Sequence, residues 1–458
     1  MIRFSPPYID DDIIKDVTSI LQSGWLTTGP ATKQLEKEMA TYCKVDHALA
    51  VNSATSGMIL MLHWYGIKEG DEVIVPAYTY CATALAVMHV GAKPVMVDVG
   101  SDFNIDCKKI KEAITEKTKA IIAVDFAGWP CDYDGIYSIV NDEDIKKKFR
   151  PSSDAQHQLG RIMIMDDAAH ALGATYKNKP IGSCADITVF SLHAVKNITS
   201  AEGGIIAINL PAPFNNTDVY NTLRIWSLNG QTKDAFAKTK AGAWQYDVIY
   251  PGFKMNMPDV LAAVALSQIK KYENMLLIER KRVYDFYTNI FSKYDWAICP
   301  PYQQTGCSSS YHLYPLRIKN VKEEERNKII EGIAGRAVAV NVHFTPLPML
   351  TVFKQAGYNI NEYPAAYNLY SNEISLPIYP QLTNDECKTV TEAVIESVKE
   401  LRPVKTLLRS ILFPVMIMMG SFDNPTLSEE REIDNEESYT YADGFVKRKA
   451  GRYYRVTA

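Results

Sequence analysis

The chain has 458 residues, of which 47% are hydrophobic and 22% are charged, and its formal net charge is -4. This length and composition predict a globular protein of roughly two or three domains. The net negative charge argues against a nucleic-acid partner, which would require a positively charged surface. The eight cysteines show no metal-ligand spacing, which predicts no metal site and fits a reducing cytosol. Neither an export signal nor an apolar run of about 20 residues is evident, so we expect a cytoplasmic protein without a stable membrane span.

The first part of the chain predicts two helices with a polar loop between them. Acidic residues before an apolar stripe, and a glycine after it, predict a helix over residues 10–24, and a second stripe predicts a helix over residues 32–42. The intervening loop SGWLTTGP, with Trp25, Thr27 and Thr28, exposes hydroxyls and backbone amides. From the residues alone, this loop either binds a ligand or merely turns the chain.

Short apolar strands then alternate with helical segments, at residues 48–51, 73–76, 91–99 and 120–124. This alternation predicts a mostly parallel sheet covered by helices. Thr55 and Ser56 follow the first strand at the start of a helix, where their hydroxyls either hold an anion or form an ordinary N-cap. Tyr80 follows the second strand and either stacks on a flat heterocycle or packs in the core.

Residues that can carry chemistry follow the next strand, which begins at Arg161 and ends in Asp166 and Asp167. Groups at the carboxyl ends of strands face the ligand crevice of an open α/β sheet. Asp167 could therefore hold the proton on a heteroaromatic nitrogen, as pyridoxal phosphate (PLP) requires, whereas Asp166 could cap a helix. Lys196 follows on a turn between two strands, where partial desolvation would lower its pKa and make it a nucleophile or base. Judged alone, it is better explained as a surface lysine on a hairpin, and only the neighbouring motifs argue for a site.

Several motifs together carry a family resemblance: SGWLTTGP, VNSATSG, VIVPAYTYCATALAVMHVGAKPVMVDV, IMDDAAHALGA and SLHAVKNITSAEGG. In this order and spacing, from about Ile2 to Arg402, the chain resembles the DegT/StrS family of PLP-dependent nucleotide-sugar aminotransferases. The resemblance implies an α/β protein of fold type I, the fold of aspartate aminotransferase. Its large, mostly parallel mixed sheet would be covered by helices, and a smaller α/β domain would follow toward the C-terminus.

The expected domains are a large PLP-binding domain at 1–255, a small domain at 256–402 and a tail outside the family at 403–458. Residues 141–160 are polar and charged and are predicted to be a surface insertion, with His157 facing solvent. A long helix over 260–287 would cross toward the small domain. A strand over 338–344 would carry His343 as an ordinary sheet residue. The tail is expected to be a partly disordered appendage, with an amphipathic anchor as the alternative.

The resemblance also assigns roles to single residues. Lys196 would form a Schiff base with PLP and act as the catalytic base, and Asp167 would keep the pyridine nitrogen cationic. His170 would hydrogen-bond the phenolic oxygen of PLP, or else cap a helix that starts there. The other cofactor-binding residues implied are Thr55 and Ser56 at the phosphate, Tyr80 over the ring, Ser191, and Asn256, which would reach the phosphate of a partner subunit in a homodimer. Trp25, Thr27 and Thr28 would contact the sugar nucleotide.

The implied reaction transfers an amino group, from glutamate by analogy, to a nucleotide-linked keto sugar in the synthesis of cell-surface glycans or related sugars. Lys196 is intact, whereas a dehydratase branch of the family has histidine there, so transamination is favoured. The SGWLTTGP segment favours a 4-keto-6-deoxy sugar, and a 3-keto sugar is the alternative. A PLP-binding regulatory or scaffold protein, whose tail recruits partners, is the alternative from a different class.

Overall fold

The computed structural model describes residues 1–233, 244–401, 446–449 and 452–455. The chain divides into two compact units, Met1–Arg402 and Pro403–Ala458. In the second unit, β15 (Val446–Lys449) pairs with β16 (Arg452–Arg455) as an antiparallel hairpin. The disorder or anchor predicted for the rest of this tail concerns residues that lie outside the described ones. No helix of the described residues is long and apolar enough to cross a membrane.

A seven-stranded sheet with the order β1-β9-β8-β5-β4-β2-β3 forms the centre of the first unit. Its strands are β1 (His47–Val51), β2 (Glu72–Pro76), β3 (Lys93–Val97), β4 (Thr118–Val124), β5 (Met163–Asp167), β8 (Ile187–Ser191) and β9 (Gly204–Ile208). The β9 strand is antiparallel to its neighbours β1 and β8, and the other pairs are parallel. These strands are almost entirely buried because helices cover both faces, which is why they read as continuous apolar runs.

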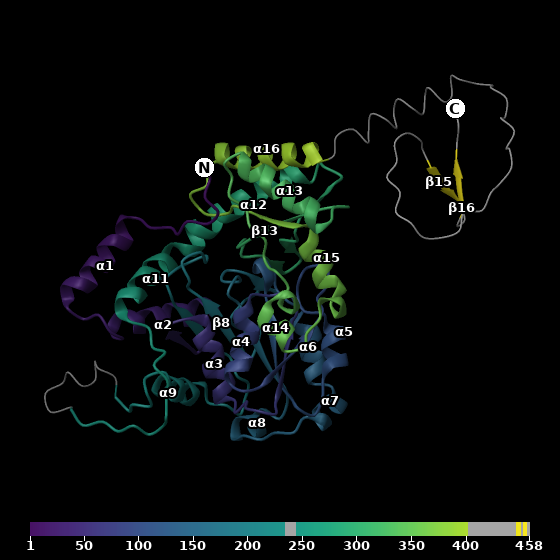
Figure 1. Cartoon of the computed structure of the whole chain (residues 1–458). Coiled ribbons are helices and arrows are strands. Elements are labelled where there is room, and N and C mark those ends of the chain that lie inside the picture. The colour runs from purple at the N-terminus through teal and green to yellow at the C-terminus, as the bar shows by residue number, and fades with distance from the viewer. Residues whose placement is uncertain (234–243, 402–445, 450–451, 456–458) are drawn as a thin grey trace. The chain divides into compact units, whose positions relative to one another are not determined.

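Helices cover this sheet (Figure 1). They are α2 (Pro30–Cys43), α3 (Ala54–Trp64), α4 (Cys81–His89), α5 (Cys107–Ala113), α6 (Tyr133–Val140) and α9 (Asn216–Trp226), with the short 3-10 turn η1 (Phe126–Gly128). The helix α11 (Asp259–Lys271) packs on α2, and α1 (Asp11–Ser23) packs on α11 rather than on the sheet. The Asp10 side chain accepts a hydrogen bond from the Ile13 backbone N–H, and Gly24 ends α1 with a positive φ of 71°. The predicted first helix is therefore confirmed, and so is the mostly parallel mixed sheet.

A second hydrophobic core lies around a smaller antiparallel sheet, β10-β13-β14. Its elements are β10 (Ala297–Ile298), β13 (Tyr314–Ile318), β14 (Glu373–Leu376), α12 (Leu277–Phe291), α13 (Glu323–Gly335) and α16 (Asn384–Leu401). The intervening elements η3 (Leu347–Met349), α14 (Thr351–Gln355), η4 (Ile360–Glu362) and α15 (Pro364–Asn372) pack their hydrophobic side chains into the core of the large sheet instead. The π-helical turn η2 (Tyr272–Leu276) joins α11 to α12, so the predicted long helix is confirmed. A sheet of short strands joins β6 (Thr175–Tyr176) and β7 (Lys179–Pro180) to β11 (Gln303–Gln304) and β12 (Cys307–Ser308). Both cores belong to one compact unit, and the domain boundary at 255 stays a prediction.

The strand predicted over residues 338–344 is wrong. The segment makes only isolated bridges, Val338 with Ile2 and Asn341 with Ser375. Its alternating valines resemble a strand, but few neighbouring backbones offer it hydrogen-bond partners, and the chain bends at His343. This departure from sheet geometry bears on the site, because His343 lines a cavity rather than a sheet surface.

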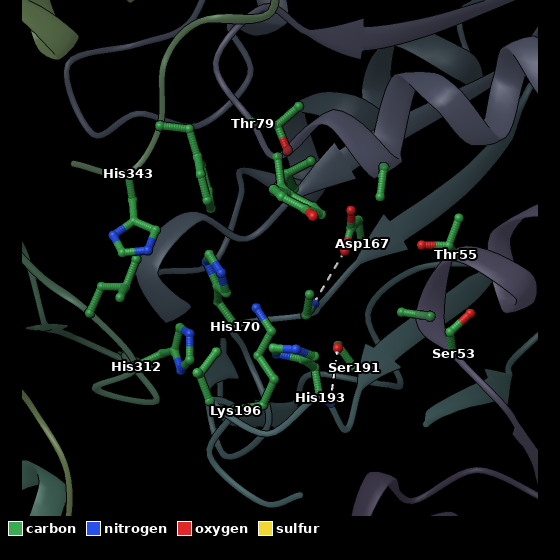
Figure 2. Close-up of a pocket in the computed structure, with 18 of the residues that line it drawn as sticks. Ser53, Thr55, Thr79, Asp167, His170, Ser191, His193, Lys196, His312 and His343 are labelled. Carbon is green, nitrogen blue, oxygen red and sulfur yellow. Dashed lines mark hydrogen bonds between the residues drawn. The ribbon is translucent and has the colours of Figure 1, made fainter. Parts of the chain in front are cut away.

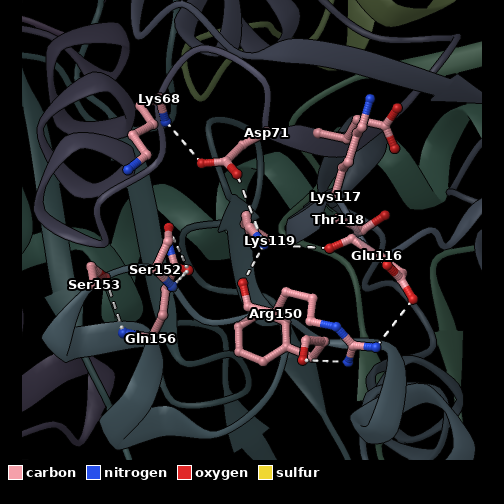
Figure 3. Close-up of polar contacts among 12 residues, drawn as sticks. Lys68, Asp71, Glu116, Lys117, Thr118, Lys119, Arg150, Ser152, Ser153 and Gln156 are labelled. Atoms are coloured by element: carbon pink, nitrogen blue, oxygen red, sulfur yellow. Dashed lines mark hydrogen bonds and ion pairs between the residues drawn. The ribbon is translucent and has the colours of Figure 1, made fainter.

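The polar segment 141–160 forms two short helices, α7 (Glu143–Lys148) and α8 (Asp154–Leu159), and His157 is exposed as expected. The segment is nevertheless anchored by buried polar groups (Figure 3). Lys119 is 3% exposed, and its ammonium donates a hydrogen bond to the Arg150 carbonyl oxygen. Gln156 is fully buried, accepts from the Ser152 backbone N–H at 2.9 Å and donates to the Tyr65 carbonyl oxygen at 3.0 Å.

We expect the substitution Gln156→Ala to lower the free energy of unfolding by about 1–3 kcal/mol, because it leaves a cavity and takes away the acceptor of the Ser152 amide. Urea denaturation of the purified protein measures this loss. Gln158→Ala, at an exposed position of the same helix, is the matched control and should change stability by less than about 0.5 kcal/mol. Equal effects of the two variants would contradict the anchoring role of Gln156.

Candidate active site

A cavity of about 410 Å³ lies at the carboxyl ends of the parallel strands (Figure 2). It is lined by six of the residues that the sequence singled out: Thr55, Tyr80, Asp167, His170, Ser191 and Lys196. Strands β5 and β8 are parallel neighbours, with Asp167 opposite Val189, so their carboxyl ends meet at the same edge of the sheet. The fold therefore brings Asp167 and the loop that carries Lys196 into one pocket.

Lys196 lies in the loop between the antiparallel partners β8 and β9, as predicted. The Lys196 backbone N–H donates to the His193 carbonyl oxygen at 2.9 Å, and the Ser200 N–H donates to the Leu192 carbonyl oxygen at 2.9 Å. These turns direct the lysine side chain into the cavity (Figure 2). Burial lowers the pKa of the Lys196 ammonium to about 8, while the negative charge of Asp167 opposes this shift. The reading of Lys196 as a surface lysine is wrong.

Asp167 ends β5 and is 5% exposed. Its carboxyl accepts a hydrogen bond from the Thr83 hydroxyl at 2.8 Å and another from the Ala169 backbone N–H at 3.3 Å. Burial raises the pKa of this carboxyl, and the Thr83 hydrogen bond and the charge of Lys196 both oppose the shift. Sequence reasoning missed Thr83, whose only signal is its place in the first turn of α4, just after Tyr80.

Asp166 points to the opposite face of β5, because successive residues of a strand alternate between its two sides. It lies within the strand, so the helix-capping role considered for it is wrong. Its carboxyl is fully buried and has no hydrogen-bond partner among the residues that the structure describes. Burial, reinforced by the nearby Asp125 carboxyl, raises the pKa of Asp166 far above its ordinary value. Asp167, rather than Asp166, faces the cavity.

The N-terminus of α3 supplies the polar end of the cavity. Ser53 is the N-cap, and its hydroxyl oxygen accepts from the Ser56 backbone N–H at 3.0 Å. The helix begins at Ala54, so Thr55 lies in its first turn. Ser53 and Thr55 line the cavity, whereas the Ser56 hydroxyl lies behind them and hydrogen-bonds Ser53. Free amides and hydroxyls at a helix N-terminus suit an anionic phosphate.

Aromatic side chains form the walls of the cavity. His170 stacks on His312 at a centroid distance of 4.3 Å and on Phe344 at 5.8 Å. Tyr80 is 59% exposed and lies 5.8 Å from Phe344, so it is available to a ligand ring rather than packed in the core. Sequence reasoning missed His312 and Phe344 and misjudged His343, because these residues reach the cavity from a distant part of the chain.

His170 is buried, and its Nδ1 accepts a hydrogen bond from the Ala127 backbone N–H at 3.3 Å. Burial and the charge of Lys196 lower the pKa of His170 well below its ordinary value, so the ring is neutral and its proton lies on Nε2. This tautomer can donate to a phenolic oxygen. No helix begins at His170, so the alternative capping role is wrong.

The other predicted residues lie outside the cavity lining of this chain. The Asn256 side chain donates to the Thr28 hydroxyl at 2.7 Å, and that hydroxyl donates to the Met257 carbonyl oxygen at 2.6 Å. The Thr27 carbonyl oxygen accepts from the Asp259 backbone N–H at 3.3 Å. Loop 25–30, with Trp25, is thus held against the segment before α11. The substrate and partner-phosphate roles of these residues stay predictions.

The donor set fits PLP. A phosphate would lie at the α3 N-terminus near Ser53, Thr55 and Ser191, and a pyridine nitrogen would face Asp167. The reactive aldehyde would then lie toward Lys196, the one lysine among the cavity-lining residues that the structure describes. The described residues contain no group of three or more histidine, cysteine or acidic side chains placed to hold a metal ion.

Comparisons with known proteins agree with this geometry. A model described as the DegT/DnrJ/EryC1/StrS aminotransferase family matches residues 7–395. The PMP-form of Spr1654 from Streptococcus pneumoniae, which carries the name of a sugar aminotransferase, is 42% identical with a TM-score of 0.84, covering 88% of this chain and 100% of that chain. The spore coat polysaccharide biosynthesis protein SpsC of Bacillus subtilis is 35% identical over 403 residues, which is 87% of this chain and 97% of SpsC.

A further relative is the UDP-4-amino-4-deoxy-L-arabinose–oxoglutarate aminotransferase of Shewanella sediminis, which is 33% identical over 407 residues. This match covers 86% of the chain and 97% of the relative. The family model, the relatives and the fold all agree with a cavity that contains the lysine, the aspartate and a helix N-terminus suited to an anion. The chain therefore belongs to the DegT/DnrJ/EryC1/StrS aminotransferase family and is a PLP-dependent sugar aminotransferase.

Proposed function

We propose that the protein transfers the amino group of glutamate to a nucleotide-linked 4-keto-6-deoxy sugar in the synthesis of a cell-surface glycan. The observation that carries the proposal is that Lys196 and Asp167 line the same cavity. The choice of donor and of the 4-keto position is supported by the name of the Shewanella relative, which pairs oxoglutarate with a 4-amino sugar. The name of SpsC supports a role in polysaccharide synthesis.

PLP, when bound, supplies an electrophilic carbon and a ring that accepts electrons. The Lys196 amine, once it has lost its proton, is the nucleophile and then the base that moves a proton from the amino donor. Asp167 holds a proton at the ring nitrogen, and its hydrogen bond from Thr83 keeps the carboxyl in place. His170 offers Nε2–H to the phenolic oxygen. The amides at the start of α3 bind the phosphate and fix the orientation of the ring.

The substitution Lys196→Ala should abolish the visible absorbance of the lysine-linked cofactor and lower amino transfer from glutamate at least about 100-fold, because it removes both nucleophile and base. Spectra and release of 2-oxoglutarate measure the two effects. Lys148→Ala, at an exposed position on α7, is the control and should behave as wild type. Wild-type protein that holds PLP but leaves glutamate unchanged would instead favour the regulatory or scaffold alternative.

The rate at which PLP recombines with the PLP-free protein should rise with pH, with a midpoint near the Lys196 pKa of about 8, because only the neutral amine attacks the aldehyde. The charge of Asp167 raises the pKa of Lys196, so Asp167→Asn should move this midpoint to lower pH. Stopped-flow absorbance across the pH range gives both midpoints. A midpoint near 10.5, the ordinary lysine value, or a rise in the Asp167→Asn variant, would refute the assignment.

The proposed homodimer, in which Asn256 contacts the phosphate in the partner subunit, gives a subunit-mixing prediction. If Asn256→Ala and Lys196→Ala are each inactive, mixed dimers regain one site in which both residues are intact. Random assortment should restore about a quarter of wild-type activity, because half of the dimers are mixed and each has one intact site of two. Refolding the two variants together and measuring activity is the test. If Asn256 serves its own subunit, mixing restores nothing.

A further inference from the structure

A buried carboxyl lies just behind the cavity wall, at Glu373 in β14. Glu373 and Ser375 project from the same side of this strand, because residues two apart share a face, and both are fully buried. Glu373 makes no ion pair with any residue that the structure describes, since the neighbouring Arg326 guanidinium donates to the Glu373 main-chain oxygen at 2.9 Å instead. A buried carboxyl without an ion-pair partner favours its neutral form.

Hydrogen bonds connect this carboxyl to the cavity. Glu373 Oε2 accepts from the His343 backbone N–H at 3.1 Å, and Glu373 Oε1 lies 2.5 Å from the Ser375 hydroxyl. The same hydroxyl lies 2.9 Å from His343 Nδ1. The His343 ring lines the cavity (Figure 2), and because Nδ1 is bound to Ser375, Nε2 is the ring nitrogen left for a ligand. A continuous path therefore runs from Glu373 through Ser375 to the ring nitrogen that faces a ligand.

The segment that carries His343 is held in place on several sides. Asn341 and Ser375 exchange two backbone hydrogen bonds, of 2.8 and 3.1 Å. The Tyr78 hydroxyl donates to the His343 carbonyl oxygen at 2.5 Å, and the Phe4 ring stacks on the imidazole at a centroid distance of 5.5 Å. The imidazole thus has a fixed orientation, and what varies is the nitrogen that carries its proton.

The protonation state of Glu373 decides which nitrogen of the His343 imidazole carries the proton. When the carboxyl is neutral, Oε1–H donates to the Ser375 oxygen, the Ser375 hydroxyl donates to His343 Nδ1, and the imidazole proton lies on Nε2. When Glu373 loses a proton, the protons shift along the path: Glu373 to Ser375, Ser375 to Nδ1, and Nε2–H to water in the cavity. The net change is one proton released, and Nε2 changes from a donor into an acceptor.

We propose that Glu373 and Ser375 are positioning residues that keep His343 in the tautomer with Nε2–H, so that His343 donates a hydrogen bond to an oxygen of the keto sugar. This inference rests on the proposed function of the cavity. The neutral imidazole follows from its burial, which, with the charge of Lys196, lowers the pKa of His343 to about 3. Burial likewise raises the pKa of Glu373 to about 8, although Ser375, the His343 amide and Arg326 oppose that shift.

Other titratable and charged groups face this path from the elements packed around it. The charge of Arg326 on α13 favours the ionised carboxyl, and Arg317 on β13 is paired opposite Glu373 in the sheet. The remaining groups are Tyr78 near Glu373, and Lys196, His170 and His312 near His343. The ionisation of Glu373 is thus predicted to weaken the sugar half-reaction as pH rises through about 8.

The substitution Glu373→Gln tests the protonation state. The glutamine oxygen accepts from the His343 amide and its NH2 group donates to Ser375, which keeps Nε2–H at every pH. For each protein and each pH, kcat/KM for the sugar half-reaction is divided by kcat/KM for the glutamate half-reaction. The titration of Lys196 affects both half-reactions and therefore cancels in this ratio. At pH 9 this ratio should be about 10-fold higher in Glu373→Gln than in wild type, because pH 9 is one unit above the pKa. Loss of the sugar half-reaction at all pH values would overturn the proposal, since a carboxylate would then be required.

The substitution Ser375→Ala tests the path itself. It should lower kcat/KM for the keto sugar about 10-fold at pH 7 and leave that for glutamate within about 2-fold of the wild-type value. The reason is that the substitution only removes the hydrogen bond that holds His343 in one tautomer. Ser371→Ala, at a buried serine on α15 that hydrogen-bonds the Asn368 carbonyl oxygen, is the matched control. An equal loss in both half-reactions, or a loss as large in Ser371→Ala, would show a merely structural role.

A measurement without sugar separates this inference from the proposed function. An unfolded glutamate ionises above its ordinary pKa of 4.5, whereas folded Glu373 stays neutral up to about 8. Its raised pKa therefore costs the wild type stability as pH rises between these values, and Glu373→Gln avoids that cost. The Tm of Glu373→Gln minus that of wild type, both with PLP bound, should grow from pH 5 to pH 8. Growth supports a neutral Glu373, on which the path depends, even if every keto sugar fails as substrate, and a flat or shrinking difference overturns the proposal.

Discussion

The site depends on an ammonium and a carboxyl that share one poorly solvated cavity. The parallel pair β5 and β8 brings Asp167 and the Lys196 loop to the same sheet edge. Burial pushes both groups toward their neutral forms, and their mutual attraction opposes this, which leaves the Lys196 pKa at about 8 and the Asp167 pKa raised. Lys196 can thus become a nucleophile at moderate pH while Asp167 remains able to hold a ring proton.

Three histidines of the cavity wall, His170, His312 and His343, contribute hydrogen bonds rather than charge. Burial lowers the pKa values of His170, His312 and His343, and the nearby ammonium lowers them further. Their neutrality matters, because a second cation beside Lys196 would depress its pKa still more and weaken its attraction to Asp167. Each ring then needs a partner that fixes its tautomer, and the structure supplies Ala127 for His170, Asn197 for His312 and Ser375 for His343.

The sequence predicts the features that depend on local chain geometry. Asp167 and Lys196 follow from strand ends, and α1 follows from its capping residues, because these signals lie within a few positions of each other. Thr83, His312 and His343 depend on tertiary packing between distant segments, which one sequence without its fold cannot show. The segment 338–344 shows the limit most clearly, because valines at alternate positions predict a strand whether or not neighbouring backbones are available to pair with it.

The central claim is that Lys196 is the amine that bonds to the cofactor. Reduction of the PLP-loaded protein with borohydride makes that bond permanent, and mass mapping of its peptides then locates the modified lysine. The account predicts one added pyridoxyl phosphate group per chain, on Lys196. A group found on any other lysine, or an unmodified Lys196 peptide from protein that had held PLP, would contradict it.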